Sequence, residues 1–288
     1  MARQPARRKP AGPKPPLREP AGPKPPLPKP PLPKPPLPKP PLPKRAGGSP
    51  ALELSARAAE ICGRLAEEYP GSARELCALS HADPFQLLVA TILSAQCTDE
   101  RVNMVTPELF RRYPGPAQLA GAEPAQVEDL IRSTGFYHAK ARHLVEMAAG
   151  VMERYGGVLP SEMGDLTSLA GVGRKTANVV RSVGFGLPGL PVDTHVGRLV
   201  RRLGLSSEID PTKVETAVCR LVPEAGWGTL SLRLILHGRR ICIARGPRCQ
   251  SCILCDLCPS ANLDGSVRPA GGSRRRSAKP TARRDGTR

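Results

Sequence analysis

Four cysteines near the C-terminal end have the number and closeness needed to hold one metal centre. Cys242, Cys249, Cys252 and Cys258 lie within seventeen residues in the pattern C-x6-C-x2-C-x5-C. A structural zinc site usually has two Cys-x2-4-Cys pairs with a longer stretch between them, and here only one pair is close. The unequal gaps favour a [4Fe–4S] cluster, whose corners lie farther apart than the ligands of one zinc ion. Both centres stay open at this point, with the cluster preferred.

The segment between the first two of these cysteines carries two arginines. Arg245 and Arg248 flank Gly246-Pro247, a pair that predicts a tight turn. A metal centre would hold this loop rigid, so both arginines could bind a phosphate backbone without prior ordering; solvated loop arginines are the alternative. Cys255 is a fifth cysteine in this segment and is interpreted as a bystander. The remaining cysteines stand in apolar helical sequence and are interpreted as small core residues: Cys62, Cys77, Cys97 and Cys219.

A glycine hairpin precedes a lysine in the middle of the chain. The sequence LAGVGRKTANVV, residues 169–180, predicts a helix, a Gly-Val-Gly turn and a second helix. Such a turn exposes successive backbone N–H groups at a helix N-terminus, which makes a phosphate site that ignores base sequence. The pattern is not a P-loop, because it lacks four residues between two glycines before Gly-Lys-Ser/Thr. We expect DNA-backbone contacts from this turn: Gly171, Val172, Gly173 and Arg174.

The excess positive charge lies at the two ends of the chain. The net charge is +18, and counting along the sequence assigns +11 to residues 1–48 and +7 to residues 265–288. Basic tails favour a polyanion partner, because each phosphate that Lys or Arg neutralises releases a counterion. The sequence shows no apolar run long enough to span a membrane and no secretory signal. We therefore expect nucleic acid as the partner, no membrane, and the reducing cytoplasm of a bacterium, at the nucleoid.

Both ends have compositions that do not favour a packed core. Residues 11–44 are an internal repeat: AGPKPPL at 11–17 recurs at 21–27, and Pro-Lys-Pro-Pro-Leu then continues with a period of five residues to Leu42. This composition predicts a disordered, extended polyproline arm over residues 1–48. This arm is either a DNA-tracking or partner-docking element or a solubilising extension. Residues 265–288 predict a second, basic disordered tail.

Between the tails the apolar residues recur at spacings of three and four, which predicts an all-α protein. Period-two alternation is scarce, so strands are not expected. The predicted helices are Ala51–Tyr69, Pro84–Ser94, Asp99–Tyr113, Pro124–Ser133, His138–Tyr155, Thr167–Leu169, Lys175–Phe185, Thr194–Leu203 and Pro211–Leu221.

Taken together and in order, these motifs resemble the endonuclease III family of helix-hairpin-helix, iron–sulfur DNA glycosylases. The resemblance rests on the LSAQCTD sequence at 93–99, the hairpin, Val-Asp-Thr-His at 192–195, His-Gly-Arg at 237–239 and the cysteine run. It covers residues 51–262 and neither tail. Two positions depart from the family pattern: Ala170 replaces a proline, which should loosen the hairpin slightly, and Phe136 replaces a leucine found in many relatives.

The resemblance implies a two-lobed all-α fold. A six-helix barrel would comprise residues 77–187 and contain the helix-hairpin-helix motif at 163–186. The [4Fe–4S] lobe would join residues 49–76 to 188–264. DNA would lie between the lobes, with Lys175 and Asp193 facing each other.

The resemblance also implies a bifunctional enzyme of base excision repair. It would act as a monomer on double-stranded DNA containing damaged pyrimidines or abasic sites. Lys175 would attack the sugar, form a Schiff base and cleave the strand by β-elimination, with Asp193 as its carboxylate partner. Burial, the charge of Arg174 and the helix N-terminus would each favour the neutral amine that attack requires. Alone, Lys175 could be a phosphate-binding lysine and Asp193 a helix N-cap.

Extrusion of the damaged nucleotide costs free energy that inserted side chains would offset. The resemblance implies that Gln96 fills the vacated space and that the loop carrying Phe136 supplies a wedge. Asp99 and His195 are candidates for the base pocket, and a hydrogen-bonded structural role is an equal alternative for His195.

Two other functions stay open at this stage. An adenine-specific mismatch glycosylase of the same superfamily would lack a lysine at position 175 and carry a catalytic glutamate in the first barrel helix, and residues 88–96 contain no acid. A non-catalytic iron–sulfur DNA-binding or redox-sensing protein would not need both Lys175 and Asp193.

Overall fold

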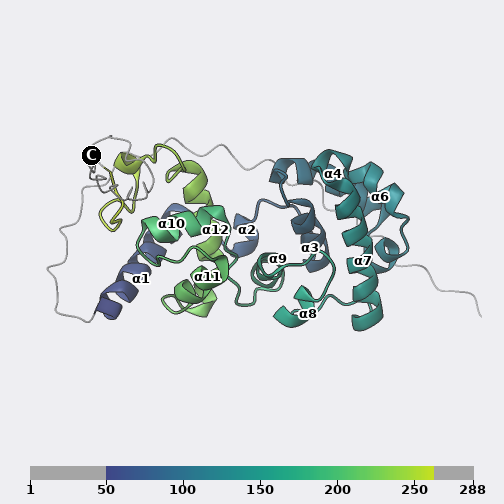
Figure 1. Cartoon of the computed structure of the whole chain (residues 1–288), viewed down its shortest axis with the longest axis horizontal. Coiled ribbons are helices and arrows are strands. Elements are labelled where there is room, and N and C mark those ends of the chain that lie inside the picture. The colour runs from purple at the N-terminus through teal and green to yellow at the C-terminus, as the bar shows by residue number, and fades with distance from the viewer. Residues whose placement is uncertain (1–49, 263–288) are drawn as a thin grey trace, which may run out of the picture. The chain divides into compact units, whose positions relative to one another are not determined.

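The computed structural model describes residues 50–262, and every element in this range is helical (Figure 1). The prediction of an all-α protein is confirmed. The predicted proline-rich arm, residues 1–48, and the basic tail, residues 265–288, lie outside the described residues. None of the described helices combines the length and the apolar character that crossing a membrane requires.

The described chain forms two compact units, of which the first is the continuous segment Ala78–Leu159. Its elements are α3 (Pro84–Leu93), α4 (Asp99–Arg112), α5 (Pro116–Ala120), α6 (Pro124–Ile131), the 3-10 turn η1 (Arg132–Thr134) and α7 (Tyr137–Tyr155).

Helix α3 is the interior helix of this unit. It begins at a cap, because the Asp83 carboxylate accepts a hydrogen bond from the Gln86 backbone N–H at 2.9 Å and Pro84 occupies the first helical position. Seven of its ten residues are buried, so it is apolar around its whole circumference, as expected of a helix surrounded by others. Helix α7 packs against α3, α5 and α6 through a buried stripe that includes Leu144 and Val151.

The second unit joins residues 50–77 to residues 160–262. Its elements are α1 (Pro50–Glu68), α2 (Ala73–Leu76), α8 (Met163–Thr167), α9 (Arg174–Val179), the π-helical turn η2 (Val180–Gly184), α10 (Thr194–Arg202), α11 (Pro211–Cys219), η3 (Glu224–Gly226), α12 (Trp227–Arg240) and η4 (Cys249–Ser251).

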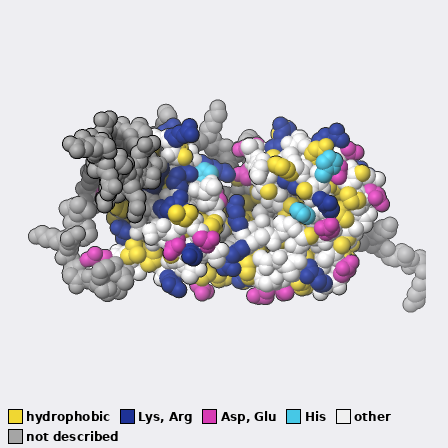
Figure 2. All heavy atoms as spheres, viewed as in Figure 1, with side chains coloured by type: hydrophobic (Ala, Val, Ile, Leu, Met, Phe, Trp, Pro, Cys, Tyr) yellow, Lys and Arg dark blue, Asp and Glu magenta, His cyan; other side chains and the backbone are white. Residues whose placement is uncertain are grey.

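One core unites the two separate stretches of this unit. Ile61 and Leu65 of α1 are fully buried in the same apolar cluster as Leu199 of α10, Leu234 of α12 and Leu254 of the cysteine segment. The N-terminal helix is therefore part of the structure that holds the cysteines. Figure 2 shows Lys and Arg side chains on the visible face around α10 and α12.

The hairpin helices group with this second unit by their contacts. Helix α9 continues into η2, which packs against α2 and α12. The approach is close, since a Cβ on Gly228 of α12 would lie 2.6 Å from the Cβ of Ser182 in η2. The contacts thus divide the chain at residues 159–160, whereas the sequence prediction placed the hairpin in the barrel and the boundary at 187. The six-helix barrel stays a prediction.

Candidate active site and cysteine centre

The glycine hairpin forms the turn between α8 and α9. Gly171 has φ of 71°, a left-handed conformation that favours glycine, and Val172 is buried with 6% of its surface exposed. Gly173 is the N-cap of α9 and supplies no side-chain cap. The N–H groups of the first turn of α9 thus have neither intrahelical acceptors nor a capping side chain, and they remain free to bind an anion.

Lys175 stands in the first turn of α9 and is exposed. The expectation that burial would favour its neutral form is therefore wrong for the described structure. Arg174 points to α11 instead, where its guanidinium donates two hydrogen bonds of 2.8 Å to the Glu215 carboxylate. Its charge is balanced by that pair, so the expected unpaired positive charge beside the Lys175 amine is also not found.

Asp193 is the N-cap of α10, as the simpler interpretation of this residue predicted. One carboxylate oxygen accepts a 2.8 Å hydrogen bond from the Val196 N–H, and the other lies 3.1 Å from His195 Nδ1. The side chain is 17% exposed, so the carboxylate is fixed but still reachable, and its oxygens retain free lone pairs. Lys175 and Asp193 belong to the same unit, and within residues 50–262 no hydrogen bond or ion pair joins them.

His195 is held in place by its neighbours. Its side chain is 29% exposed, and a Cβ on Gly238 would lie 3.1 Å from its Cδ2 atom, so the ring packs closely on α12. The hydrogen bond to Asp193 agrees with the structural alternative, and the base contact of His195 stays a prediction.

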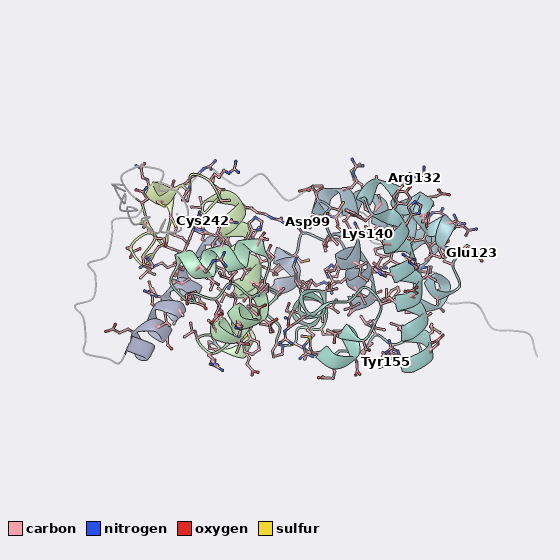
Figure 3. The ribbon with its side chains drawn as sticks, viewed as in Figure 1. Asp99, Glu123, Arg132, Lys140, Tyr155 and Cys242 are labelled. Carbon is pink, nitrogen blue, oxygen red and sulfur yellow. The ribbon has the colours of Figure 1, made fainter. Side chains whose placement is uncertain are left out.

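The predicted duplex-inserting residues lie in the other unit and share a backbone property. Gln96 has φ of 54° and Phe136 has φ of 49°, and these are the two non-glycine residues with positive φ in the described chain. Both are exposed, Phe136 to 68%. Left-handed backbone is costly for L-residues and clusters at functional sites. Asp99, in the first turn of α4 nearby in sequence, is partly exposed (Figure 3).

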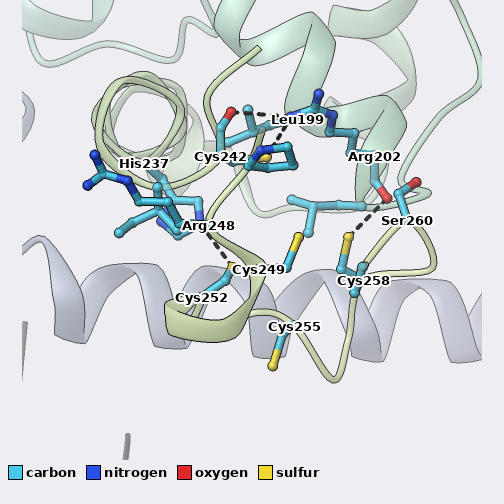
Figure 4. A pocket seen from close by; sticks show the side chains of 14 residues that line it. Leu199, Arg202, His237, Cys242, Arg248, Cys249, Cys252, Cys255, Cys258 and Ser260 are labelled. Atoms are coloured by element: carbon cyan, nitrogen blue, oxygen red, sulfur yellow. Dashed lines mark hydrogen bonds between the residues drawn. The ribbon is translucent and has the colours of Figure 1, made fainter. Parts of the chain in front are cut away.

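The four predicted cysteine ligands surround one hollow (Figure 4). Cys242 follows α12, Cys249 begins η4 and Cys252 follows η4, and these three residues line the hollow together with Cys255 and Cys258. The Cys255 sulfur points away from the other four sulfurs (Figure 4), but the residue also lines the hollow, so its interpretation as a bystander stays a prediction. None of the nine cysteines forms a disulfide. Within the described residues, no three His, Cys, Asp or Glu side chains converge closely enough to bind a single ion.

N–H donors are directed at two of these sulfurs. Arg202 Nη1 donates to Cys242 Sγ at 3.3 Å, the Leu254 N–H donates to Cys252 Sγ at 3.4 Å, and His237 Nε2 lies 3.3 Å from the same sulfur. Burial raises the pKa of the Cys252 thiol to about 12. A buried thiol of this kind stays protonated at neutral pH unless a metal replaces its proton.

Two arginines of α10 that the sequence analysis did not single out hold the cysteine loop. Arg202 donates to the carbonyls of Ile243 at 2.8 Å and Ala244 at 2.9 Å, and Arg198 donates to that of Cys242 at 3.1 Å. The predicted DNA-binding arginines Arg245 and Arg248 follow on this loop, and both are exposed. The i, i+4 spacing of the two α10 arginines indicates a shared helix face, but no sequence signal identifies partners about forty residues away.

Comparison with known proteins agrees with this arrangement. The family model described as HhH-GPD superfamily base excision DNA repair protein matches residues 89–224. Endonuclease III of Synechocystis sp. is 49% identical over 206 residues, which are 71% of this chain and 93% of the relative.

Solved structures extend the likeness to the fold. A non-covalent endonuclease III–DNA complex and a trapped endonuclease III–DNA covalent intermediate are 38% and 39% identical to this chain. Each matches with a TM-score of 0.67 over 72% of this chain and 96% of the other. They confirm the predicted helix-hairpin-helix glycosylase fold. The chain therefore belongs to the endonuclease III family of base excision repair enzymes and is a DNA glycosylase and abasic-site lyase of that type.

Proposed function

We propose that this enzyme removes oxidised pyrimidines from duplex DNA and cleaves the strand at the resulting abasic site, with Lys175 as the covalent nucleophile. The observation that carries the proposal is the placement of Lys175: an exposed amine one residue beyond a glycine-capped helix N-terminus, in the same unit as a fixed carboxylate. A trapped covalent complex with DNA in a relative that is 39% identical supports a covalent route.

The neutral Lys175 amine attacks C1′ of the deoxyribose. A bond forms between Nζ and C1′ while the glycosidic bond breaks, and the base leaves with the electron pair. Loss of the amine proton, with Asp193 as the acceptor, opens the sugar ring and gives the Schiff base. The Schiff base acidifies the C2′ hydrogen, so its removal breaks the C3′–O bond and expels the 3′ phosphate. Hydrolysis of the imine then restores the lysine.

Residues of both units outside the catalytic pair bind and shape the DNA. The Gly171–Gly173 turn and the arginines at 245 and 248 bind backbone phosphates, which fixes the register of the duplex without reading its sequence. Gln96 and Phe136 occupy the space that the extruded nucleotide leaves. His195 orients the Asp193 carboxylate through its hydrogen bond. One chain provides both Lys175 and Asp193, which supports action as a monomer.

The cysteine hollow fits a [4Fe–4S] cluster held by Cys242, Cys249, Cys252 and Cys258. Four thiols surround one space, and N–H donors point at the Cys242 and Cys252 sulfurs, as suits thiolates bound to iron. When bound, the cluster supplies a rigid crosslink of the segment 242–258. The residues of the chain then hold Arg245 and Arg248 at the surface, through the arginines of α10.

The test is a duplex with one thymine glycol, incubated with and without borohydride. We expect strand cleavage and a covalent adduct from the wild-type enzyme, and neither from Lys175→Ala. Lys213→Ala is a matched control, because Lys213 is an exposed lysine in the first turn of α11 in the same unit. Adduct formation by Lys175→Ala would contradict the assigned nucleophile. Base loss without any adduct would indicate a glycosylase that uses water.

A further inference from the structure

Lys140 is a buried lysine that the proposed reaction does not use. It stands in the first turn of α7 with 5% of its surface exposed (Figure 3). Its ammonium donates hydrogen bonds to the backbone carbonyls of Leu93 at 2.8 Å and Thr134 at 2.9 Å. Within the described residues it forms no ion pair with a carboxylate. Burying a charge in this way is costly, so the contacts it makes need an explanation.

The two acceptors share a structural position. Leu93 is the last residue of α3, and Thr134 is the last residue of η1. Carbonyl groups at helix C-termini lack intrahelical donors and carry partial negative charge, so one ammonium satisfies both ends. Burial lowers the pKa of Lys140, and the nearby Cys97 opposes that shift. Lys140 thus joins two segments that lie forty-one residues apart in the sequence.

Each joined segment leads directly into a strained turn. Gln96 follows Leu93 by three residues, and Phe136 follows Thr134 by two; these are the two left-handed non-glycine residues described above. Such conformations persist only where the surrounding structure holds them. The Lys140 ammonium is the group that binds the main chain ahead of both turns.

We propose that Lys140 is a positioning residue that clamps the Gln96 and Phe136 turns into one rigid unit for insertion into a duplex. The inference rests on the proposed function, since it assigns these two residues to the space left by the extruded nucleotide. The clamp would matter where a base must be extruded and would matter little where the sugar is already accessible.

A lysine with a merely structural role would behave differently. Its loss would lower stability and slow every reaction of the folded enzyme in the same proportion. The two cases separate when the enzyme acts on two substrates, one that requires extrusion and one that does not. The first is a thymine glycol within a fully paired duplex, and the second is an abasic site in a single strand.

The experiment measures single-turnover rates of the intact chain and its Lys140→Met variant on both substrates. Met has a similar length but no donors. We expect base removal from the duplex to slow by about tenfold or more, and single-strand cleavage to stay within about twofold of wild type. Equal slowing on both substrates, or no slowing on either, would overturn the clamp. A wild-type enzyme that removed no base from the duplex would instead count against the proposed function.

A mutant cycle tests whether Lys140 acts through the two turns. In a Gln96→Ala, Phe136→Ala background, Lys140→Met should cause less than about a twofold further loss on the duplex. A fully additive loss would mean that the lysine acts elsewhere. Should Lys140→Met not fold, Lys140→Arg replaces it, because it keeps the charge but changes the shape of the donor. The same selective loss on the duplex is then expected, and equal loss on both substrates overturns the proposal.

Discussion

The two units place the residues of the proposed reaction in different kinds of backbone. In the unit formed by residues 50–77 and 160–262, Lys175 and Asp193 occupy ordinary positions at helix starts, and the Asp193 carboxylate caps its own helix. In Ala78–Leu159, Gln96 and Phe136 have left-handed backbone, and each follows a segment that is bound by the buried Lys140 ammonium. Chemistry needs a reactive group at a defined point, which an unstrained helix start provides. The proposed insertion needs side chains that project from the surface, and Gln96 and Phe136 project from left-handed backbone.

The largest effect should come from the unstrained unit. Asp193→Asn keeps a good N-cap residue but removes the charge, so base removal should slow by about 10²- to 10⁴-fold in single-turnover assays. Unfolding by urea should change by less than about 1 kcal/mol. Asp210→Asn is the control, since Asp210 caps α11 through the Lys213 N–H at 3.0 Å and should leave the rate unchanged. Equal slowing by both variants would mean that Asp193 acts only as a helix N-cap and not as a proton acceptor.

The two hairpin glycines should have different functions: Gly171 should matter for stability, and Gly173 should matter for DNA binding. Gly171→Ala forces an L-residue into φ of 71° and should destabilise the protein by about 1–2 kcal/mol in thermal unfolding. At Gly173 the backbone is ordinary, and a Cβ would meet nothing within 4 Å, so Gly173→Ala should fold normally. It should still weaken duplex binding, because the methyl group would stand at the phosphate site. Unchanged binding by Gly173→Ala would contradict that site.

Arg245 and Arg248 of the cysteine loop should affect the binding of duplex DNA but not the rate of base removal. An Arg245→Ala, Arg248→Ala double variant should bind duplex DNA roughly tenfold more weakly at low salt and reduce the slope of log K against log salt by about 2. Arg220→Ala removes an exposed arginine at the end of α11 and serves as the control. An unchanged salt slope in the double variant would mean that these arginines are solvated.

The smallest effect concerns stability in the strained unit. Glycine adopts left-handed backbone freely, so Gln96→Gly or Phe136→Gly should be neutral or stabilise the fold by roughly 0.5 kcal/mol while reducing base removal. Gln118→Gly, at an exposed position in α5, should destabilise it by about 1 kcal/mol. Destabilisation of similar size in all three variants would show that the positive φ angles carry no stored strain.

The sequence predicted the helices with clear caps and periodicity, and the spacing of the four cysteines predicted that they would lie around one space, as they do. Helix α12 was missed, because Leu230, Leu232, Leu234 and Leu236 alternate as in a strand while the packed residues follow the helical period. The strained turns were not predictable either, since neither Gln96 nor Phe136 is a glycine. The burial expected for Lys175 was wrong, because one residue cannot report how the neighbouring chain covers it.

Lys140 shows the same limit in a different form. A lysine in the first turn of a helix is normally interpreted as a solvent-exposed side chain. Its burial depends on the backbone carbonyls of Leu93, forty-seven residues before it, and Thr134, six residues before it. Any residue type carries such a carbonyl, so the sequence does not identify these partners. Contacts of this kind become visible only when the backbone is traced in space.

Helix α10 begins at the Asp193 cap and ends at Arg202, which binds the cysteine loop. An inserted or deleted residue would rotate one end by about 100° relative to the other and shift it by about 1.5 Å. Either change would turn Arg202 away from the carbonyls of Ile243 and Ala244, or shift the Asp193 and His195 pair relative to the cysteine loop that Arg202 binds. The length of α10 therefore fixes the distance and the rotation between the Asp193 end and the cysteine loop. Insertions and deletions in this helix should not be tolerated, whereas substitutions on its exposed face should be.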